Sequence, residues 1–172
     1  YLSASTSRWN VLLKHVSNLT LKPLSETRWS SRIDAIKPFK FNLGDIYDSL
    51  LKLSAEDNKD LKSRVTAESL ARKIISFKFI CSVEIWYNIL SKIHVVSNLL
   101  QKPNLNILEC LRLLQDIKSN LVQWRSDSEF LLVLKAAAEN AAALNLDIQP
   151  VFKNHLPLRS RKIKPNFNYE AK

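Results

Sequence analysis

Apolar residues recur every three to four positions along most of this chain, which is the spacing of one face of an α-helix. The first such segment, STSRWNVLLKHVSNL, opens with hydroxyl residues that can cap a helix. Its apolar stripe consists of Trp9, Leu12, Leu13, Val16 and Leu19. The pattern predicts a short amphipathic helix at the start of the chain.

Two more helices are predicted before residue 56. After a loop at 18–24, Ser25 is a candidate N-cap, and the stripe that follows it contains Trp29, Ile33, Ile36 and Phe39. Pro38 has no backbone N–H, so we expect it to kink or end this second helix. A third helix is predicted from Asn42, and its inward positions are Ile46, Leu50 and Leu53, flanked by Tyr47 and Leu51.

The rest of the chain is predicted to be helical as far as residue 144. Residues 59–101 keep a helical period throughout, which predicts two helices or one bent helix, with the apolar segment IISFKFICSVEIWYNIL central to the core. QKPN at 101–104 predicts a loop because Pro103 disfavours helix. NILECLRLLQDIKSNLVQW predicts a strongly amphipathic helix, and SDSEFLLVLKAAAENAAAL predicts another, capped by Ser126 or Asp127 or continuous with the one before it.

Glycine usage supports an all-helical fold. Gly44 is the single glycine of 172 residues, which excludes the phosphate-binding loops GxGxxG and GxxxxGK[ST] and disfavours strand-rich folds. We therefore predict an all-α protein, an irregular bundle of about five to seven helices over 1–149. From Pro150 the periodicity is lost and basic residues accumulate, so 150–172 is predicted to be a basic, poorly structured linker or tail.

The charge of the chain is strongly positive, and other composition signals exclude several site classes. A net charge of +10 attracts polyanions such as nucleic acid, although charge alone identifies no partner. Cys81 and Cys110 are isolated and lack the spacing of a zinc site. No signal peptide is evident, and Lys78 and Glu84 interrupt the most apolar segment, so we expect a soluble protein without a membrane partner.

Candidate catalytic chemistry is sparse. The eight aspartates and eight glutamates are dispersed, and we interpret them as solvated charges on polar helix faces. No Ser-His-Asp arrangement has a local signature, and a buried Cys81 would be a poor nucleophile. We therefore predict that this chain is not an enzyme by itself. It begins at Tyr1 and contains no methionine, which we interpret as a piece of a longer protein.

Trp29 has two open interpretations. Trp9, Trp86 and Trp124 fall on apolar stripes and are predicted to be core residues. Trp29 instead follows Arg28 directly and precedes Arg32 and Lys37, an arrangement in which the ring could stack on an unpaired base while the cations hold phosphates. Core packing of Trp29 is the alternative. In the tail, the cations are either part of a solvated linker or phosphate contacts; they are Arg159, Arg161, Lys162 and Lys164.

Five segments in order along nearly the whole chain resemble a known family: SASTSRW, LSETRWSSRIDAIK, WYNILSKIHVVSNLLQ, RSRKIK and FNYE. They are similar to the middle region of hAT-superfamily transposases and, more closely, to transposase-derived proteins described as MYM-type or TTF-type zinc finger proteins. The resemblance implies an all-helical insertion within a ribonuclease-H-like catalytic domain. It also implies that Trp29 stacks on bases exposed at the transposon end, with Arg28 assisting.

The resemblance places the catalytic chemistry outside this chain. Two metal-binding aspartates are expected before Tyr1, and a glutamate beside a dimerisation region is expected after Lys172. The parent protein would use Mg²⁺ or Mn²⁺ and an upstream structural Zn²⁺, with no cofactor in this fragment. DNA in the nucleus is the implied partner, and any homo-oligomer would form through regions outside the fragment. The alternative function is a domesticated helical scaffold for protein interactions without DNA activity.

Overall fold

The structure is a computed structural model, and it describes residues 1–22, 25, 30–56, 60–103 and 106–152. These residues form seven α-helices and one short 3₁₀ helix, with no strand among them, which confirms the predicted all-α fold. The elements are η1 (Leu2–Ala4), α1 (Thr6–His15), α2 (Ser30–Phe41), α3 (Leu43–Ala55), α4 (Leu61–Ile74), α5 (Phe77–Leu100), α6 (Ile107–Gln123) and α7 (Asp127–Ala143). The predicted tail lies outside the described residues from 153 onward.

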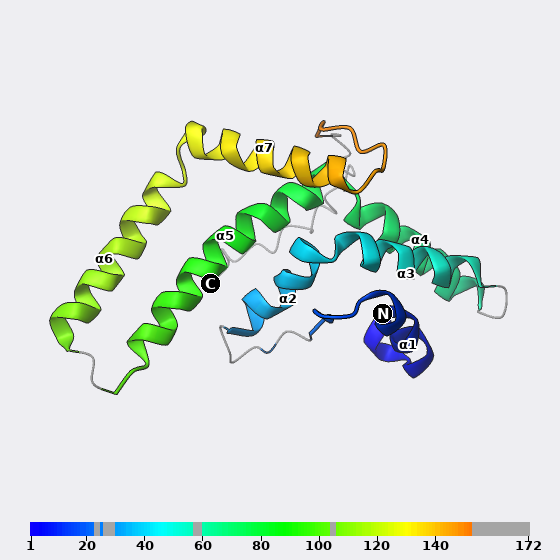
Figure 1. Cartoon of the computed structure of the whole chain (residues 1–172), viewed down its shortest axis with the longest axis horizontal. Helices are drawn as coiled ribbons and strands as arrows, with labels where there is room; N and C mark the ends of the chain where they lie inside the picture. The colour runs from blue at the N-terminus through cyan, green and yellow to red at the C-terminus, as the bar shows by residue number, and fades with distance from the viewer. Residues whose placement is uncertain (23–24, 26–29, 57–59, 104–105, 153–172) are drawn as a thin grey trace, which may run out of the picture.

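The helices form two parts (Figure 1). We call α1 to α4 with the start of α5 the body, and we call α5, α6 and α7, which form three sides of an open arrangement, the frame. α3 and α4 lie side by side as a hairpin, and α1 packs against α3. The long α5 runs away from this hairpin with α2 along its side. α6 returns antiparallel to the far half of α5, and α7 crosses back over the near half. α5 therefore belongs to both the body and the frame.

The core lies where α1, α3, α4, the first turns of α5 and the last turns of α7 meet. Its most buried large side chains include Leu12, Ile46 and Leu53. α7 contributes alanines, Ala137 and Ala141, whose small side chains allow two helix backbones to approach closely. The inward positions predicted for the third helix, Ile46, Leu50 and Leu53, are confirmed.

Polar side chains set several helix starts, of which Ser126 was a predicted cap and Ser76 and Asn106 were not named from the sequence. Ser76 accepts a hydrogen bond from the Phe79 N–H and divides the 59–101 segment into α4 and α5, so the two-helix alternative holds. Ser126 accepts from the Glu129 N–H and begins α7, which separates it from α6. Asn106 caps α6 in the same way.

Pro38 does not end its helix, so that part of the prediction is wrong. α2 continues through Pro38 to Phe41, and α3 begins two residues later at Leu43. A proline in a helix loses one hydrogen bond to the residue four positions earlier, but it still supplies a carbonyl acceptor. Here the Pro38 carbonyl accepts the Asn42 N–H at 2.8 Å, and the Pro38 ring is buried. Burial of the ring compensates for the missing backbone bond.

The tryptophan predictions have mixed outcomes. Trp9 is half-buried and packs against the core. Trp124 is also half-buried, at the C-terminal end of α6. Trp86 was predicted to be a core residue and is 53 % exposed, so this prediction is wrong. The helical period of α5 was read correctly, but α5 is covered on fewer sides than its apolar composition indicated.

Candidate nucleic-acid interface

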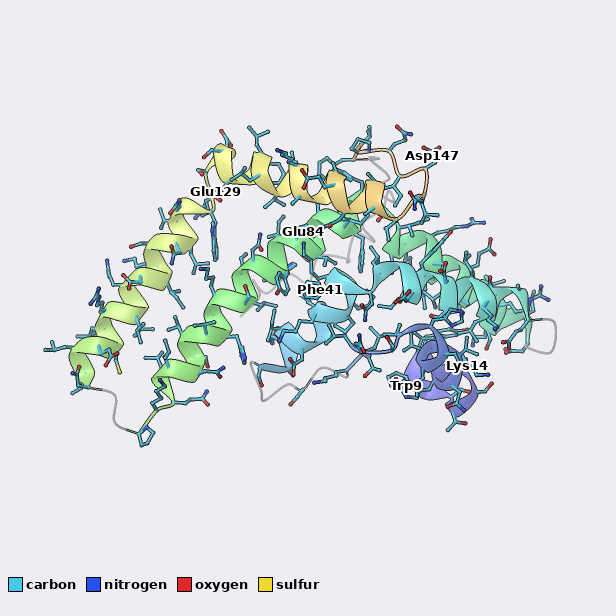
Figure 2. All side chains as sticks on the ribbon, in the orientation of Figure 1. Trp9, Lys14, Phe41, Glu84, Glu129 and Asp147 are labelled. Carbon is cyan, nitrogen blue, oxygen red and sulfur yellow. The ribbon has the colours of Figure 1, made fainter. Side chains whose placement is uncertain are left out.

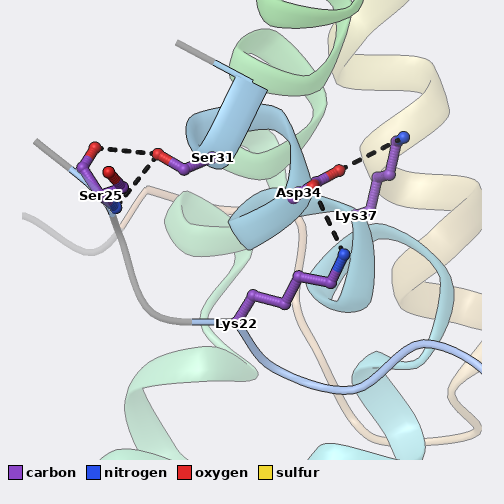
Figure 3. Close-up of polar contacts among 5 residues, drawn as sticks. All are labelled: Lys22, Ser25, Ser31, Asp34 and Lys37. Atoms are coloured by element: carbon purple, nitrogen blue, oxygen red, sulfur yellow. Dashed lines mark hydrogen bonds and ion pairs between the residues drawn. The ribbon is translucent and has the colours of Figure 1, made fainter. Parts of the chain in front are cut away.

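The candidate interface lies at the N-terminal end of α2 (Figure 3). Of the predicted DNA-binding residues, Arg32 and Lys37 lie on α2, in its first and second turns. The remaining predicted residues lie outside the described part of the chain; they are Arg28, Trp29, Arg159, Arg161, Lys162 and Lys164. The structure therefore describes the residues that flank Arg28 and Trp29 in the sequence, which are Ser25 on one side and α2 from Ser30 on the other.

Ser31 binds the loop that precedes α2. Its Oγ accepts the Ser25 backbone N–H at 3.1 Å, and its hydroxyl donates to the Ser25 carbonyl at 2.9 Å. One side chain thus satisfies both backbone polar groups of a residue six positions earlier. We call this pair of bonds the Ser25–Ser31 clasp. It fixes the two flanks of the segment in which Arg28 and Trp29 stand, because each flank is held to the other.

Ser25 was predicted to be the N-cap of this helix. In the structure its backbone contacts Ser31, and Ser25 itself lies outside the helix. The residues between Ser25 and Ser30 are outside the described part, so the capping role of its side chain stays a prediction.

Two lysines flank a single carboxylate beside the clasp. Lys22 Nζ lies 3.4 Å from Asp34 Oδ2, and Lys37 Nζ lies 3.7 Å from Asp34 Oδ1. Such exposed ion pairs stabilise a fold weakly, by about 0–1 kcal/mol. Their effect on the local charge matters more than their effect on stability, because the single carboxylate of Asp34 cannot neutralise both ammonium groups. Counting only the described residues, Lys22, Arg32 and Lys37 stand at this end of α2 with the single carboxylate of Asp34.

The opposite face of α2 anchors this helix to α5. Ile33 is 1 % exposed, next in sequence to Arg32 and Asp34. Farther along, Phe39 meets Phe79 and Phe41 meets Tyr87 in edge-to-face contacts with ring centroids 5.5 Å apart. The cationic end of α2 is therefore presented on a helix that packing holds in place.

Glu84 was missed by the sequence analysis and corrects one of its predictions. The carboxylates were interpreted as solvated, yet Glu84 is 3 % exposed inside the apolar part of α5. Lys40 of α2 donates to both of its oxygens at 2.5 Å, and the Asn140 amide of α7 donates to Oε1 at 2.6 Å. Glu84 faces the space between α2 and α7 (Figure 2). It thus joins three helices that are far apart in the sequence.

A sequence signal for Glu84 existed in part. It is the single acidic residue of FICSVEIWYNIL, and a charge on an otherwise apolar helix needs a partner. The partners could not be found, because Lys40 and Asn140 are 44 and 56 residues away along the chain.

Other chemistry is limited in the described part of the chain. Cys81 is a buried free thiol, and its burial raises its pKa, which disfavours the nucleophilic thiolate. No group of three His, Cys, Asp or Glu side chains that could hold a metal ion occurs among the residues described.

α5 contains the most apolar segment of the chain, for which the sequence analysis expected no membrane partner. Among the described residues, the helix Phe77–Leu100 has the length and the apolar composition that would allow it to cross a membrane. A single helix of this kind is weak evidence, because core helices of soluble proteins share these properties. The absence of a membrane partner stays a prediction.

Comparison of the chain with protein-family models, with curated proteins and with solved structures finds no match. The resemblance to hAT-superfamily transposases therefore depends on the sequence segments alone, and what it implies enters below as a proposal.

Proposed function

We propose that this chain is a helical DNA-binding domain of the kind inserted in hAT-superfamily transposases. Its role would be to hold DNA at the transposon end, in the nucleus, while catalytic acids elsewhere in the parent protein act with Mg²⁺ or Mn²⁺. The observation that carries the proposal is the Ser25–Ser31 clasp beside the cationic end of α2. The described residues on either side of Arg28 and Trp29 in the sequence are joined by this clasp, and Lys22, Arg32 and Lys37 lie among them or close to them in the chain.

The distribution of charge supports this proposal. Residues 107–143, which comprise α6, α7 and the turn between them, carry four basic and five acidic side chains. Because the whole chain has a net charge of +10, the remaining residues carry +11. Of this, residues 1–106, which contain α2, carry 16 basic and 9 acidic side chains, and residues 153–172 carry six basic and one acidic. Phosphate contacts need lysine and arginine, so these two parts of the chain are suited to DNA and α6 and α7 are not.

The proposed mechanism combines two kinds of contact. The Trp29 indole stacks on an unpaired base, a contact worth about 1–3 kcal/mol. Lysine and arginine side chains contact phosphates and displace counterions, which makes the affinity fall as salt rises. Stacking then gives preference for unpaired bases, and the cations give affinity for any DNA backbone.

A second candidate is a helical scaffold for protein interactions that lacks DNA activity. The observation that favours it is α6, which has no buried residue and exposes several large apolar side chains. The two candidates differ in what Trp29 does, since it is packed in a scaffold and stacked on a base in a DNA-binding domain.

Binding to a flapped or hairpin DNA and to a fully paired duplex separates these candidates. Trp29→Ala should weaken flapped-DNA binding about 5- to 150-fold, the equivalent of 1–3 kcal/mol. The slope of log affinity against log salt should stay unchanged, because the indole contacts no phosphate.

Trp86→Ala is the matched control. It removes another indole, one that is 53 % exposed on α5 and away from the clasp, and it should leave both affinities unchanged. Equal affinity of the wild type and Trp29→Ala for flapped DNA would reject the stacking role. If the wild type bound neither DNA, the scaffold would be the better account.

A further inference from the structure

α6 has two adjacent apolar faces, and only one of them has a partner among the described residues. With about 100° between successive residues, one face turns toward α5 and is half-buried; it contains Cys110, Leu113, Ile117, Leu121 and Trp124. The other face spans an arc of about 120° beside it. We call this second face the outer stripe, and it consists of Ile107, Leu108, Leu111, Leu114 and Val122. An ordinary surface helix has one apolar stripe.

The exposure of the outer stripe is high. Its five side chains are 51–78 % exposed. α7 meets α6 at the corner of the frame, and three residues in its first two turns are 43–64 % exposed; they are Phe130, Leu131 and Leu132. Large apolar patches of this kind on a soluble domain mark interaction surfaces.

The apolar area approaches that of a standard interface. If each exposed side chain offers about 100 Å² of apolar surface, the five of the outer stripe offer roughly 500 Å², and those at the start of α7 that share its side raise the total toward an upper bound of roughly 800 Å². This upper bound is about what one partner buries in a protein–protein interface of standard size.

The charges around the outer stripe favour a copy of the same chain. α6 itself carries Glu109, Arg112, Asp116 and Lys118, so its net charge is zero. Two copies with a net charge of +10 each repel one another over most of their surface, but not across a neutral face. A neutral helix also lacks the cationic face with which interfacial helices bind anionic lipids, and it offers nothing to a phosphate backbone.

We propose that the outer stripe, together with the start of α7, is the interface through which two copies of this chain dimerise. In a two-fold dimer the same patch serves both partners, so one self-complementary apolar surface is enough. This interface lies within the chain and differs from the homo-oligomer contacts outside it that the family resemblance implies. The cationic end of α2 lies on a different element, so both copies would keep it available.

The test measures molar mass by light scattering and sedimentation of the 172-residue chain, at concentrations up to about 100 µM. The wild type should reach the mass of a dimer, and the double variant Leu108→Glu/Leu111→Glu should stay monomeric. Leu61→Glu is the matched control, because Leu61 is a 74 % exposed leucine on α4, and it should dimerise like the wild type.

Misfolding of the Glu variant could also abolish the dimer, so two controls separate this effect from loss of the interface. Circular dichroism checks helix content, and a milder variant, Leu108→Gln/Leu111→Gln, keeps the side-chain length and should weaken dimerisation at least tenfold. Flapped-DNA binding by the Glu variant should remain, which separates this proposal from the proposed function. A wild type that is monomeric throughout, including one that instead binds phosphatidylcholine–phosphatidylserine vesicles, would overturn the proposal. Dimers that persist in the folded double variant would overturn it too.

Discussion

Replacement of Lys40 by methionine should destabilise the fold strongly. Lys40 Nζ donates to both oxygens of Glu84 at 2.5 Å, and the Glu84 side chain is 4 % exposed. Without the ammonium group, the carboxylate stays buried between α2, α5 and α7 with Asn140 as its remaining donor in the described contacts. Breaking a buried pair in this way costs about 3–5 kcal/mol. Lys40 is itself 19 % exposed, so water can partly replace it and we expect about 3 kcal/mol.

Equilibrium unfolding in urea and thermal unfolding measure this cost. For a chain of this size, 3 kcal/mol corresponds to a fall in Tm of about 6–12 °C. The double variant Lys40→Met/Glu84→Leu removes the unpaired charge and should regain most of the lost stability, because apolar side chains of similar volume can replace a buried ion pair.

Arg72→Met is the control. Arg72 pairs with Glu68 one helical turn away on the exposed side of α4, and loss of this pair should cost less than about 0.5 kcal/mol. If Lys40→Met cost no more than Arg72→Met, or if the double variant were as unstable as Lys40→Met, the stabilising role of the buried pair would be refuted.

Two further predictions concern single side chains. Cys81 should react with a thiol reagent much more slowly than the half-buried Cys110 at pH 7–8, because burial raises the Cys81 pKa. Unfolding should make the two reaction rates equal. Mass-spectrometric mapping of the labels measures both rates, and equal rates in the native protein would contradict this prediction. Ser31→Ala removes both clasp bonds and should speed hydrogen exchange at the Ser25 amide and weaken flapped-DNA binding several-fold, whereas Ser54→Ala, which removes a hydroxyl bonded within its own helix, should do neither.

The helices could be predicted from the sequence because their apolar period is local information. Ser126 could also be recognised as a candidate helix start, since a cap is read from its nearest neighbours. Pro38 was misjudged, because tertiary burial compensates for its missing hydrogen bond. Trp86 was misjudged because periodicity shows which face of a helix is apolar but not whether another element covers it.

The candidate interface was predictable in part. Arg32 and Lys37 were identified from their neighbours in sequence, and the structure adds Lys22 and Asp34 to that group. The clasp could not be predicted, because serine is common before helices and its partner depends on how the loop turns. Glu84 could be noticed but not explained, since its partners come from two distant helices. Contacts between residues far apart in the chain cannot be predicted from a single sequence.

The most direct test of the central claim places 2-aminopurine at the unpaired position of a flapped DNA and follows its fluorescence on binding. Stacking of this base on the Trp29 indole should quench the fluorescence with the wild type and with Trp86→Ala, but not with saturating Trp29→Ala. Equal quenching by wild type and Trp29→Ala, or no quenching by the bound wild type, would contradict the proposal that Trp29 faces DNA bases.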